Sequence, residues 1–347
     1  MNETGILILN LGSPDSYQVS DVKKYLREFL MDGRVIDAPY LIRALIVEGF
    51  ILPTRPKKSA HAYESVWTPE GPPLKVFTEA FRRKLEKEVA LPIAVAMRYG
   101  NPTPEAALKE LSAKCGSLKE VFIAPMYPHY AMSSYETALV HVENEIKKNW
   151  PSLKVKVLKP FYNEKEYIKS VAQSIRPYIE KEFDQLLFSY HGLPVRHLKK
   201  SDTTGKHCYS CANCCDTPSP AWDTCYKHQV TNTSHLVAKE LGLDKSKYAI
   251  SFQSRLGRDE WIKPATADRL QQLPKEGVKR LLIVCPAFVA DCLETVEEIS
   301  IAGKESFLSA GGESFQVIPC LNDFDPWVKT FATYCNDREK EQAHLWA

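Results

Sequence analysis

Eight short runs of apolar, largely β-branched residues recur along the chain and constrain its fold more than any other feature. Runs of this length and composition, separated by helical patterns, predict buried strands. They lie at Ile6–Leu11, Ile93–Met97, Val121–Pro125, Val155–Leu158, Leu186–Ser189, Tyr248–Phe252, Leu281–Pro286 and Phe315–Pro319. The starts at residues 93, 121 and 155 are 28 and 34 residues apart, and those at 248, 281 and 315 are 33 and 34 apart. Such spacing is typical of strand–helix–strand units with parallel strands.

The two sets of strands follow the same plan. In each set a long insertion follows the first strand, with 87 residues between the starts of the first two strands and 62 in the second set. Arg98–Gly100 follows the second strand of one set and Arg255–Gly257 follows that of the other, while Glu136–Thr137 and Glu294–Thr295 follow the third strands. Short matches also arise by chance, so the strand spacing is the stronger argument for an internal duplication.

This pattern predicts an α/β fold of two Rossmann-like lobes, each with a four-stranded parallel sheet flanked by helices. A length of 347 residues exceeds that of most single domains, which agrees with two lobes. We expect the lobes to span residues 1–159 and 160–347, with a cysteine-rich insert at 197–228. The C-terminal helix at 326–347 could pack back on either lobe.

Composition excludes some classes of protein. A net charge of +2, from 45 basic and 43 acidic residues, gives no electrostatic basis for nucleic-acid binding. The N-terminal stretch has no basic segment and reaches Gly12 and Pro14 too early for a signal peptide, so we expect a cytoplasmic protein. The longest apolar run, Leu281–Ala290, contains Pro286 and is too short for a membrane-spanning helix.

The carboxyl ends of the predicted strands carry most of the chemically interesting residues. No glycine-rich dinucleotide motif or Walker A sequence follows any strand, so nucleotide binding lacks its usual signature. Ligands of open α/β sheets nevertheless bind at these ends. The residues there are Arg98, Tyr127, His129, His191, Arg255 and Glu294.

His191 directly follows a buried strand in the segment FSYHGLP, where Gly192 and Pro194 predict a tight turn. A histidine in such a position can accept a proton near neutral pH or bind a borderline metal. A structural histidine bonded to a backbone carbonyl is an equally good interpretation of this local motif.

An acidic helix is predicted to begin at the end of another strand, in the segment CPAFVADCLETVEEI. Glu294 and Glu298 are four residues apart and share a helix face, as do Asp291 and Glu294 at three apart. A row of carboxylates there could conduct a divalent cation. An ordinary acidic first turn would explain Asp291 and Glu294, but less well Glu297 and Glu298.

Five of the ten cysteines lie within 18 residues, which predicts a metal site rather than disulfides in a reducing compartment. Four thiolates suffice for zinc or for an iron–sulfur cluster, and free thiols without metal are the remaining alternative. The five are Cys208, Cys211, Cys214, Cys215 and Cys225.

Six segments, in this order across nearly the whole chain, closely resemble the motifs of ferrochelatases. They are NLGSPDS, AMRYGNP, APMYPHYAMSS, FSYHGLP, FQSRLGRDEW and AFVADCLETVEEI. The resemblance implies two Rossmann-type lobes, a porphyrin bound between them and insertion of Fe²⁺ into protoporphyrin IX to form protohaem in haem biosynthesis. The substrates would then be protoporphyrin IX and Fe²⁺.

By motif position, His191 and Glu294 match the catalytic pair of the family. We expect His191 to act as proton acceptor or metal ligand, and Glu294 with Glu298 to relay protons or the substrate iron. The predicted substrate-binding residues are Leu11, Arg55, Arg98, Tyr99 and Tyr127. The two arginines could bind the propionates of the porphyrin through bidentate hydrogen bonds.

The cysteine segment resembles the internal cluster of some bacterial ferrochelatases. Animal-type members instead use C-terminal cysteines and one in the loop corresponding to Tyr130–Met132, where this chain has no cysteine. The resemblance implies a 2Fe–2S cluster bound by Cys208, Cys214, Cys215 and Cys225, with Cys211 as a substitute and zinc as the alternative metal.

The apolar segment Pro39–Pro53 corresponds to the hydrophobic lip of the porphyrin-binding mouth in this family. The lip could contact a membrane surface, which would place the protein peripherally at the inner face of the cell membrane. Periodicity alone favours an amphipathic helix packed on the core.

Several alternatives stay open at this stage. A chelatase of the same fold could insert iron into coproporphyrin or cobalt into an open tetrapyrrole precursor, and a non-enzymatic haem- or metal-binding sensor is a third class. The sequence is compatible with a monomer or a homodimer.

Overall fold

The computed structural model describes residues 3–255 and 259–347. The chain forms two compact units. Unit 1 comprises Met1–Tyr127, Met132–Lys159 and Phe331–Ala347, and unit 2 comprises Pro128–Ala131 and Pro160–Thr330.

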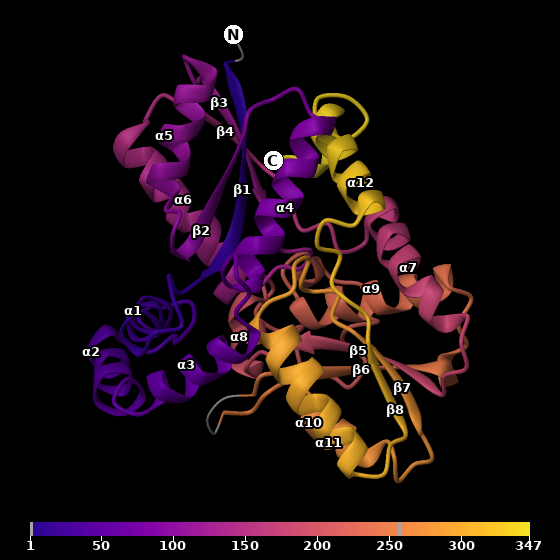
Figure 1. The fold of residues 1–347 in the computed structure, drawn as a ribbon. Coiled ribbons are helices and arrows are strands. Elements are labelled where there is room, and N and C mark those ends of the chain that lie inside the picture. Colours follow the sequence, from indigo (N-terminus) through magenta and orange to yellow (C-terminus); the bar gives the residue numbers. More distant parts are fainter. Residues whose placement is uncertain (1–2, 256–258) are drawn as a thin grey trace. The chain divides into compact units, whose positions relative to one another are not determined.

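The described residues of unit 1 form a four-stranded parallel sheet in the order β2-β1-β3-β4 (Figure 1). Its strands are β1 (Thr4–Ser13), β2 (Ile93–Gly100), β3 (Glu120–Pro125) and β4 (Lys154–Val157). The central strand β1 is inaccessible to solvent from Ile6 to Leu9, as expected for a parallel sheet covered on both faces. Gly12 lets β1 continue beside β2, because a Cβ at this position would lie 1.9 Å from the Tyr99 carbonyl oxygen.

Helices cover both faces of this sheet. Figure 1 shows α5 (Pro104–Cys115) and α6 (Thr137–Asn149) on one side and α4 (Pro73–Glu88) on the other. The last part of α12 (Asp325–Asn336) packs against α4, with the rings of Phe331 and Phe81 5.4 Å apart. The C-terminus continues the sheet edge, because Ala347 and Val157 exchange backbone hydrogen bonds of 2.7 and 2.8 Å.

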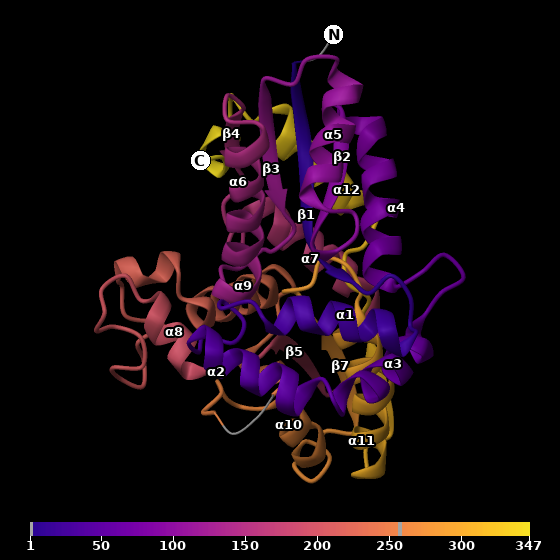
Figure 2. The same ribbon diagram turned by 90° about the vertical axis from the view of Figure 1, so that its left-hand side faces the viewer.

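The insertion between β1 and β2 adds helices beyond the carboxyl ends of the strands, as both views show (Figure 1, Figure 2). The Tyr25 hydroxyl anchors the first of them by donating to the Gly12 carbonyl over 3.2 Å. Before α4 the insertion contains α1 (Val19–Leu30), α2 (Tyr40–Ala44), the π-helix η1 (Leu45–Ile51) and α3 (Arg55–Val66).

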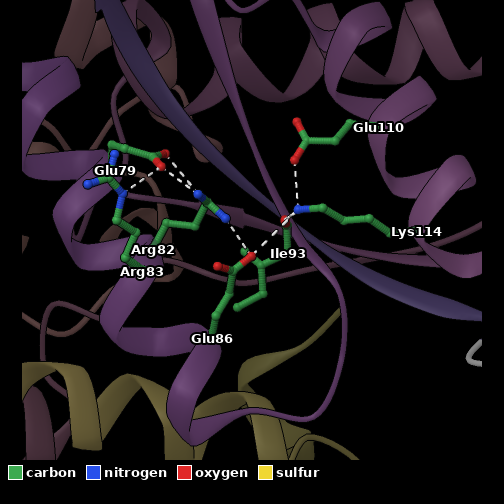
Figure 3. A network of polar contacts seen from close by, with 7 residues as sticks. All are labelled: Glu79, Arg82, Arg83, Glu86, Ile93, Glu110 and Lys114. Carbon is green, nitrogen blue, oxygen red and sulfur yellow. Dashed lines mark hydrogen bonds and ion pairs between the residues drawn. The ribbon is translucent and has the colours of Figure 1, made fainter.

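A polar network surrounds the edge strand β2 (Figure 3). On α4, Arg82 pairs with Glu79 and, over 2.5 Å, with Glu86. On α5, Lys114 pairs with Glu86 over 3.5 Å and donates to the carbonyl of Ile93 over 2.8 Å. Helices on opposite faces are thus joined around the strand that has only one neighbour.

The described residues of unit 2 form a second parallel sheet of four strands, in the equivalent order β6-β5-β7-β8. Its strands are β5 (Gln185–His191), β6 (Tyr248–Gln253), β7 (Arg280–Val284) and β8 (Ser314–Val317). Figure 1 shows α7 (Lys165–Ile179) and α9 (Tyr226–Glu240) on one face, with α10 (Thr266–Gln272) and α11 (Lys304–Ser309) on the other. The core under α10 and α11 is built around Leu273, Phe307 and Ile283, which are fully buried.

The predicted α/β fold is confirmed, including both four-stranded parallel sheets. Strand ends differ from the prediction. The apolar runs at Leu281–Pro286 and Phe315–Pro319 end as strands at Val284 and Val317, before their prolines. Proline has no N–H to donate to the ladder, so hydrophobicity alone overestimates the length of such a strand.

Candidate active site

His191 is the last residue of β5, and its half-buried ring is oriented by the following turn. Its Nδ1 lies 2.6 Å from the Gly192 carbonyl oxygen, which can only accept. In the neutral ring the proton therefore sits on Nδ1, which leaves the lone pair on Nε2. Gly192 is required here, because a Cβ would lie 2.8 Å from the Gln253 carbonyl oxygen.

Glu294 begins the π-helix η5 (Glu294–Gly303), where the sequence predicted a helix without specifying its type. π-Helical turns are rare in proteins overall, and those that occur often lie at functional sites. One turn later, Glu298 accepts from the backbone N–H of Ser254 over 2.7 Å and from its hydroxyl over 2.5 Å. Ser254 has φ +66°, a conformation that a non-glycine residue rarely adopts.

His191 and Glu294 both influence the Glu298 carboxyl electrostatically. Burial raises the pKa of Glu298, the hydrogen bonds from Ser254 and the charge of His191 oppose this rise, and the Glu294 carboxylate adds to it. Glu298 is therefore a half-buried carboxyl that can hold a proton at a higher pH than usual. In residues 3–255 and 259–347, no three His, Cys, Asp or Glu side chains form a ready-made metal site.

The predicted substrate-binding residues all belong to unit 1, whereas His191, Glu294 and Glu298 belong to unit 2. Leu11 is half-buried on β1, Tyr99 is fully buried near the end of β2, and Arg55 is exposed at the start of α3. Tyr127 follows β3, and its buried hydroxyl meets no hydrogen-bond partner among the described residues. Burial raises its pKa well above the usual value, so the phenol stays protonated.

Arg98 is held by an acidic residue that the sequence did not single out. Its Nη2 lies 2.5 Å from Asp32 Oδ2, and its Nε donates to the Thr137 hydroxyl over 2.9 Å. The same carboxylate oxygen accepts from the hydroxyls of Tyr99, over 2.9 Å, and of Thr137. No local motif marks Asp32, because its side-chain partners lie 66 to 105 residues away in sequence.

These contacts keep Asp32 ionised. Burial raises the pKa of Asp32, but hydrogen bonds from Thr137 and the Arg34 backbone, together with the charge of Arg98, outweigh burial and lower it. The side chains of Asp32 and Arg98 are 6% and 13% exposed, so this is a largely buried ion pair.

In the structure Cys208 and Cys225 share one buried cluster, and the Cys215 thiol hydrogen-bonds to Cys225. Cys208, Cys214 and Cys225 are buried, Cys215 is half-buried and Cys211 is exposed. Hydrogen bonds from the Cys215 and Cys208 thiols and from backbone N–H groups at the start of α9 lower the pKa of Cys225 to about 6. Burial raises the pKa of Cys208, and the hydrogen bond to Cys225 raises that of Cys215.

Polar contacts fold the cysteine segment into a compact loop. Asp202 accepts from the backbone N–H groups of His207 and Cys208 over 2.7 and 2.8 Å. His207 Nε2 lies 2.7 Å from the Cys214 carbonyl oxygen, and His228 Nδ1 lies 2.7 Å from that of Cys215. The low pKa of Cys225 favours a thiolate there, but within the described residues no three cysteines of the loop are arranged as a ready-made metal site.

The apolar segment at 39–53 is exposed on α2 and η1. Its exposed fractions are 65% for Tyr40, 80% for Leu41, 52% for Ile42, 63% for Leu45 and 69% for Phe50. The alternative of a helix packed on the core is therefore wrong for most of this segment. Among the described residues, no helix has the length and hydrophobicity needed to cross a membrane.

The sequence was also compared with known protein families. The family model described as "Ferrochelatase" matches residues 3–339. The chain belongs to the ferrochelatase family. The predicted resemblance is therefore confirmed, and with it a metal-chelating type of enzyme.

Relatives share this family over nearly their full length. A ferrochelatase of Opitutus terrae is 46% identical over 335 residues, covering 96% of each chain. One of Pseudomonas savastanoi pv. phaseolicola is 45% identical over 336 residues, covering 96% of this chain and 98% of the relative.

A solved structure of SirB from Bacillus subtilis with Fe3+ aligns with this ferrochelatase-family chain at a TM-score of 0.56. The alignment covers 99% of this chain and 98% of SirB, at 13% identity, and it therefore shows a shared fold.

Proposed function

We propose that the chain inserts Fe²⁺ into protoporphyrin IX to form protohaem, with release of two protons, as a lyase of haem biosynthesis. The observation that supports this proposal is that His191 keeps its Nε2 lone pair, because Nδ1 is bonded to the Gly192 carbonyl, and that His191 influences Glu298 on the π-helix that Glu294 begins. Membership of the ferrochelatase family supports the reaction type.

The reaction needs a base, because two pyrrole N–H protons must leave while iron enters the ring. His191 accepts a proton at Nε2, since Nδ1 is committed to the Gly192 carbonyl. Glu294 and Glu298 pass on protons or the substrate iron. Glu298 suits this role because burial raises its pKa while Ser254 fixes its carboxylate.

The residues proposed to bind porphyrin offer apolar and cationic surfaces. Leu11 and Tyr127 would contact the ring, and Tyr99 supports Arg98 through their shared partner Asp32. Arg98 keeps free N–H groups for a propionate, because Asp32 and Thr137 use only part of its five donors. Within the described residues no ion pair engages the exposed Arg55, which leaves its guanidinium available for the other propionate.

We infer that Cys208, Cys214, Cys215 and Cys225 hold a 2Fe–2S cluster, with zinc as the competing metal. Burial and the low pKa of Cys225 support these residues, while exposure argues against Cys211 as a ligand. When bound, the cluster would supply a cross-link within the loop, and metal insertion needs no electron from it.

Cys214→Ser tests the cluster, with Cys211→Ser as the matched control. We expect Cys214→Ser to lose iron and acid-labile sulfide and to lower the melting temperature, whereas Cys211→Ser keeps both. A colourless wild type with stoichiometric zinc and no sulfide would instead assign the site to zinc.

We also propose that the exposed side chains of Tyr40, Leu41, Leu45 and Phe50 contact a membrane peripherally. An apolar cluster of this kind lowers its free energy by entering a lipid interface, and a cytoplasmic protein would meet the inner face of the cell membrane. Leu41→Ser/Phe50→Ser should reduce co-sedimentation with lipid vesicles, and unchanged sedimentation would contradict the proposal.

The substrate assignment is tested by anaerobic assays with protoporphyrin IX and coproporphyrin, each with Fe²⁺ and with Co²⁺. We expect the highest kcat/KM for Fe²⁺ and protoporphyrin IX. Preference for coproporphyrin or for Co²⁺ would move the chain to a sister activity of the same fold.

A further inference from the structure

Asn322, which lies between β8 and α12, holds Asp291 through both ends of its side-chain amide. Its Nδ2 donates to Asp291 Oδ2 over 2.7 Å, and its Oδ1 accepts from the Asp291 backbone N–H over 2.8 Å. Its own backbone N–H donates to the Val289 carbonyl over 2.8 Å. The segment before η5 is thus fixed by a residue 31 positions away in sequence.

The second oxygen of Asp291 carries this constraint into the first turn of η5. The Thr295 hydroxyl donates to Asp291 Oδ1 over 2.8 Å and accepts from the Cys292 backbone N–H over 3.0 Å. Glu294 lies between Asp291 and Thr295 in the sequence. The hydrogen bonds of these two residues therefore fix the position of the Glu294 backbone. Thr295 is 1% exposed, which shields the hydrogen bonds from competing water.

The carboxylates of Glu294 and Glu298 differ in the hydrogen bonds that hold them directly. Two donors from Ser254 fix Glu298. The carboxylate of Glu294 receives the weak donor of the Cys292 thiol, and the contact from Gln253 Nε2 reaches only its backbone oxygen, over 3.4 Å. The location of the Glu294 side chain therefore depends on where its helix begins.

Asn322 also adopts φ +46°, in the left-handed region. Asparagine occupies this region more readily than other non-glycine residues, although glycine does so at the lowest cost. A turn alone would favour glycine, so the amide side chain must contribute something that glycine cannot supply. The two hydrogen bonds to Asp291 are that contribution.

We propose that Asn322 is a positioning residue for Glu294, acting through Asp291 and the first turn of η5. This inference rests on the proposed role of Glu294 in proton or iron transfer. Asn322 need not touch the porphyrin, so its loss should slow the chemical step rather than weaken porphyrin binding.

Asn322→Gly is the sharpest test, because glycine keeps the backbone conformation and removes only the amide. We expect kcat to fall roughly tenfold to a hundredfold, as for a small misplacement of a reacting group, with the KM for porphyrin within about twofold of wild type. Asn336→Gly is the matched control, since it removes an amide that donates to the Glu88 carbonyl in unit 1. The control should keep wild-type kcat.

Glu294→Gln separates the two hypotheses. Full activity of Glu294→Gln would contradict the proposed function itself. Loss of activity in Glu294→Gln with wild-type kcat in Asn322→Gly would overturn only the positioning role. In the double variant we expect little loss beyond that of Glu294→Gln, and a full multiplication of the two effects would place the action of Asn322 elsewhere.

Thr295→Val and Thr295→Ser provide a second test if Asn322→Gly folds poorly. Valine removes the hydroxyl that links Asp291 to Cys292, whereas serine keeps it. We expect a selective loss of kcat in the valine variant and recovery in the serine variant. Equal kcat in both would contradict the inference.

Discussion

The two units share a strand order but handle charge in opposite ways at equivalent positions. In unit 1, Glu136 pairs with Arg34 over 2.8 Å, and the Thr137 hydroxyl lies between Asp32 and Arg98. The corresponding pair in unit 2 is Glu294–Thr295. There, Thr295 also donates to an aspartate, Asp291.

The two units differ in whether a cationic side chain pairs with these acidic residues. Among the described residues of unit 2, no lysine or arginine forms an ion pair with Glu294 or Glu298, while both acidic residues of the unit 1 set have an arginine. At these positions unit 1 thus has carboxylates paired with arginines, whereas Glu294 and Glu298 have no such partner among the described residues of unit 2. The predictions that follow test this difference.

Glu294→Gln against Glu136→Gln should give the largest contrast. If Glu294 transfers protons or iron as proposed, its loss lowers kcat about 10²- to 10⁴-fold, whereas Glu136 forms a half-exposed ion pair. Steady-state haem formation measures both. Similar losses in the two variants would show that the units do not differ in the way described.

Asp32→Ala should be the most destabilising change in the unit 1 set. It leaves the Arg98 guanidinium, only 13% exposed, without its carboxylate, which typically costs about 3 kcal/mol. Urea unfolding at pH 7 measures the change in free energy. The loss should shrink as the pH falls below about 4, because the lowered pKa of Asp32 means that wild type loses this stabilisation when the carboxylate is protonated.

Glu298→Gln should have the opposite sign and a smaller size. The pKa of Glu298 is raised in the folded protein, so its ionisation lowers stability as the pH rises through that pKa. The glutamine variant should therefore be more stable than wild type at pH 7 but lower in activity, and the gain should vanish in acid. A less stable variant at pH 7 would indicate that the carboxylate stabilises the fold.

Glu86→Gln should have the smallest effect. Its partners Arg82 and Lys114 are 17% and 36% exposed, and ion pairs near the surface contribute about 0.5 kcal/mol. The loss should decrease in high salt and leave kcat unchanged. A large change in kcat would link the edge of β2 to the chemistry, contrary to the contrast between the units.

The sequence predicted those features that local patterns determine. Apolar β-branched runs revealed the eight strands found in the described residues, and their spacing revealed the repeated topology. The strand ends at Val284 and Val317 were missed because hydrophobicity continues where proline stops the ladder. The packing of the segment at 39–53 was not predictable, because the same periodicity describes a buried and an exposed apolar helix.

Contacts between distant residues left no local signal. Asp32 reaches Arg98 across 66 residues, and Asn322 reaches Asp291 across 31. The π-helical form of η5 was equally hidden, because the sequence pattern predicted a helix without specifying its type. His191 and Glu294 could be singled out because each follows a strand that the sequence does reveal and because each lies in a motif that resembles the family's.

The most direct test of the account compares His191→Ala with wild type under anaerobic conditions, with Fe²⁺ and protoporphyrin IX. His235→Ala serves as the matched control, since His235 is a unit 2 histidine whose Nδ1 hydrogen-bonds to the Tyr248 hydroxyl. We predict haem formation by wild type and His235→Ala, and retained porphyrin binding without haem in His191→Ala. Haem formation by His191→Ala at the wild-type rate would contradict the central role of this histidine.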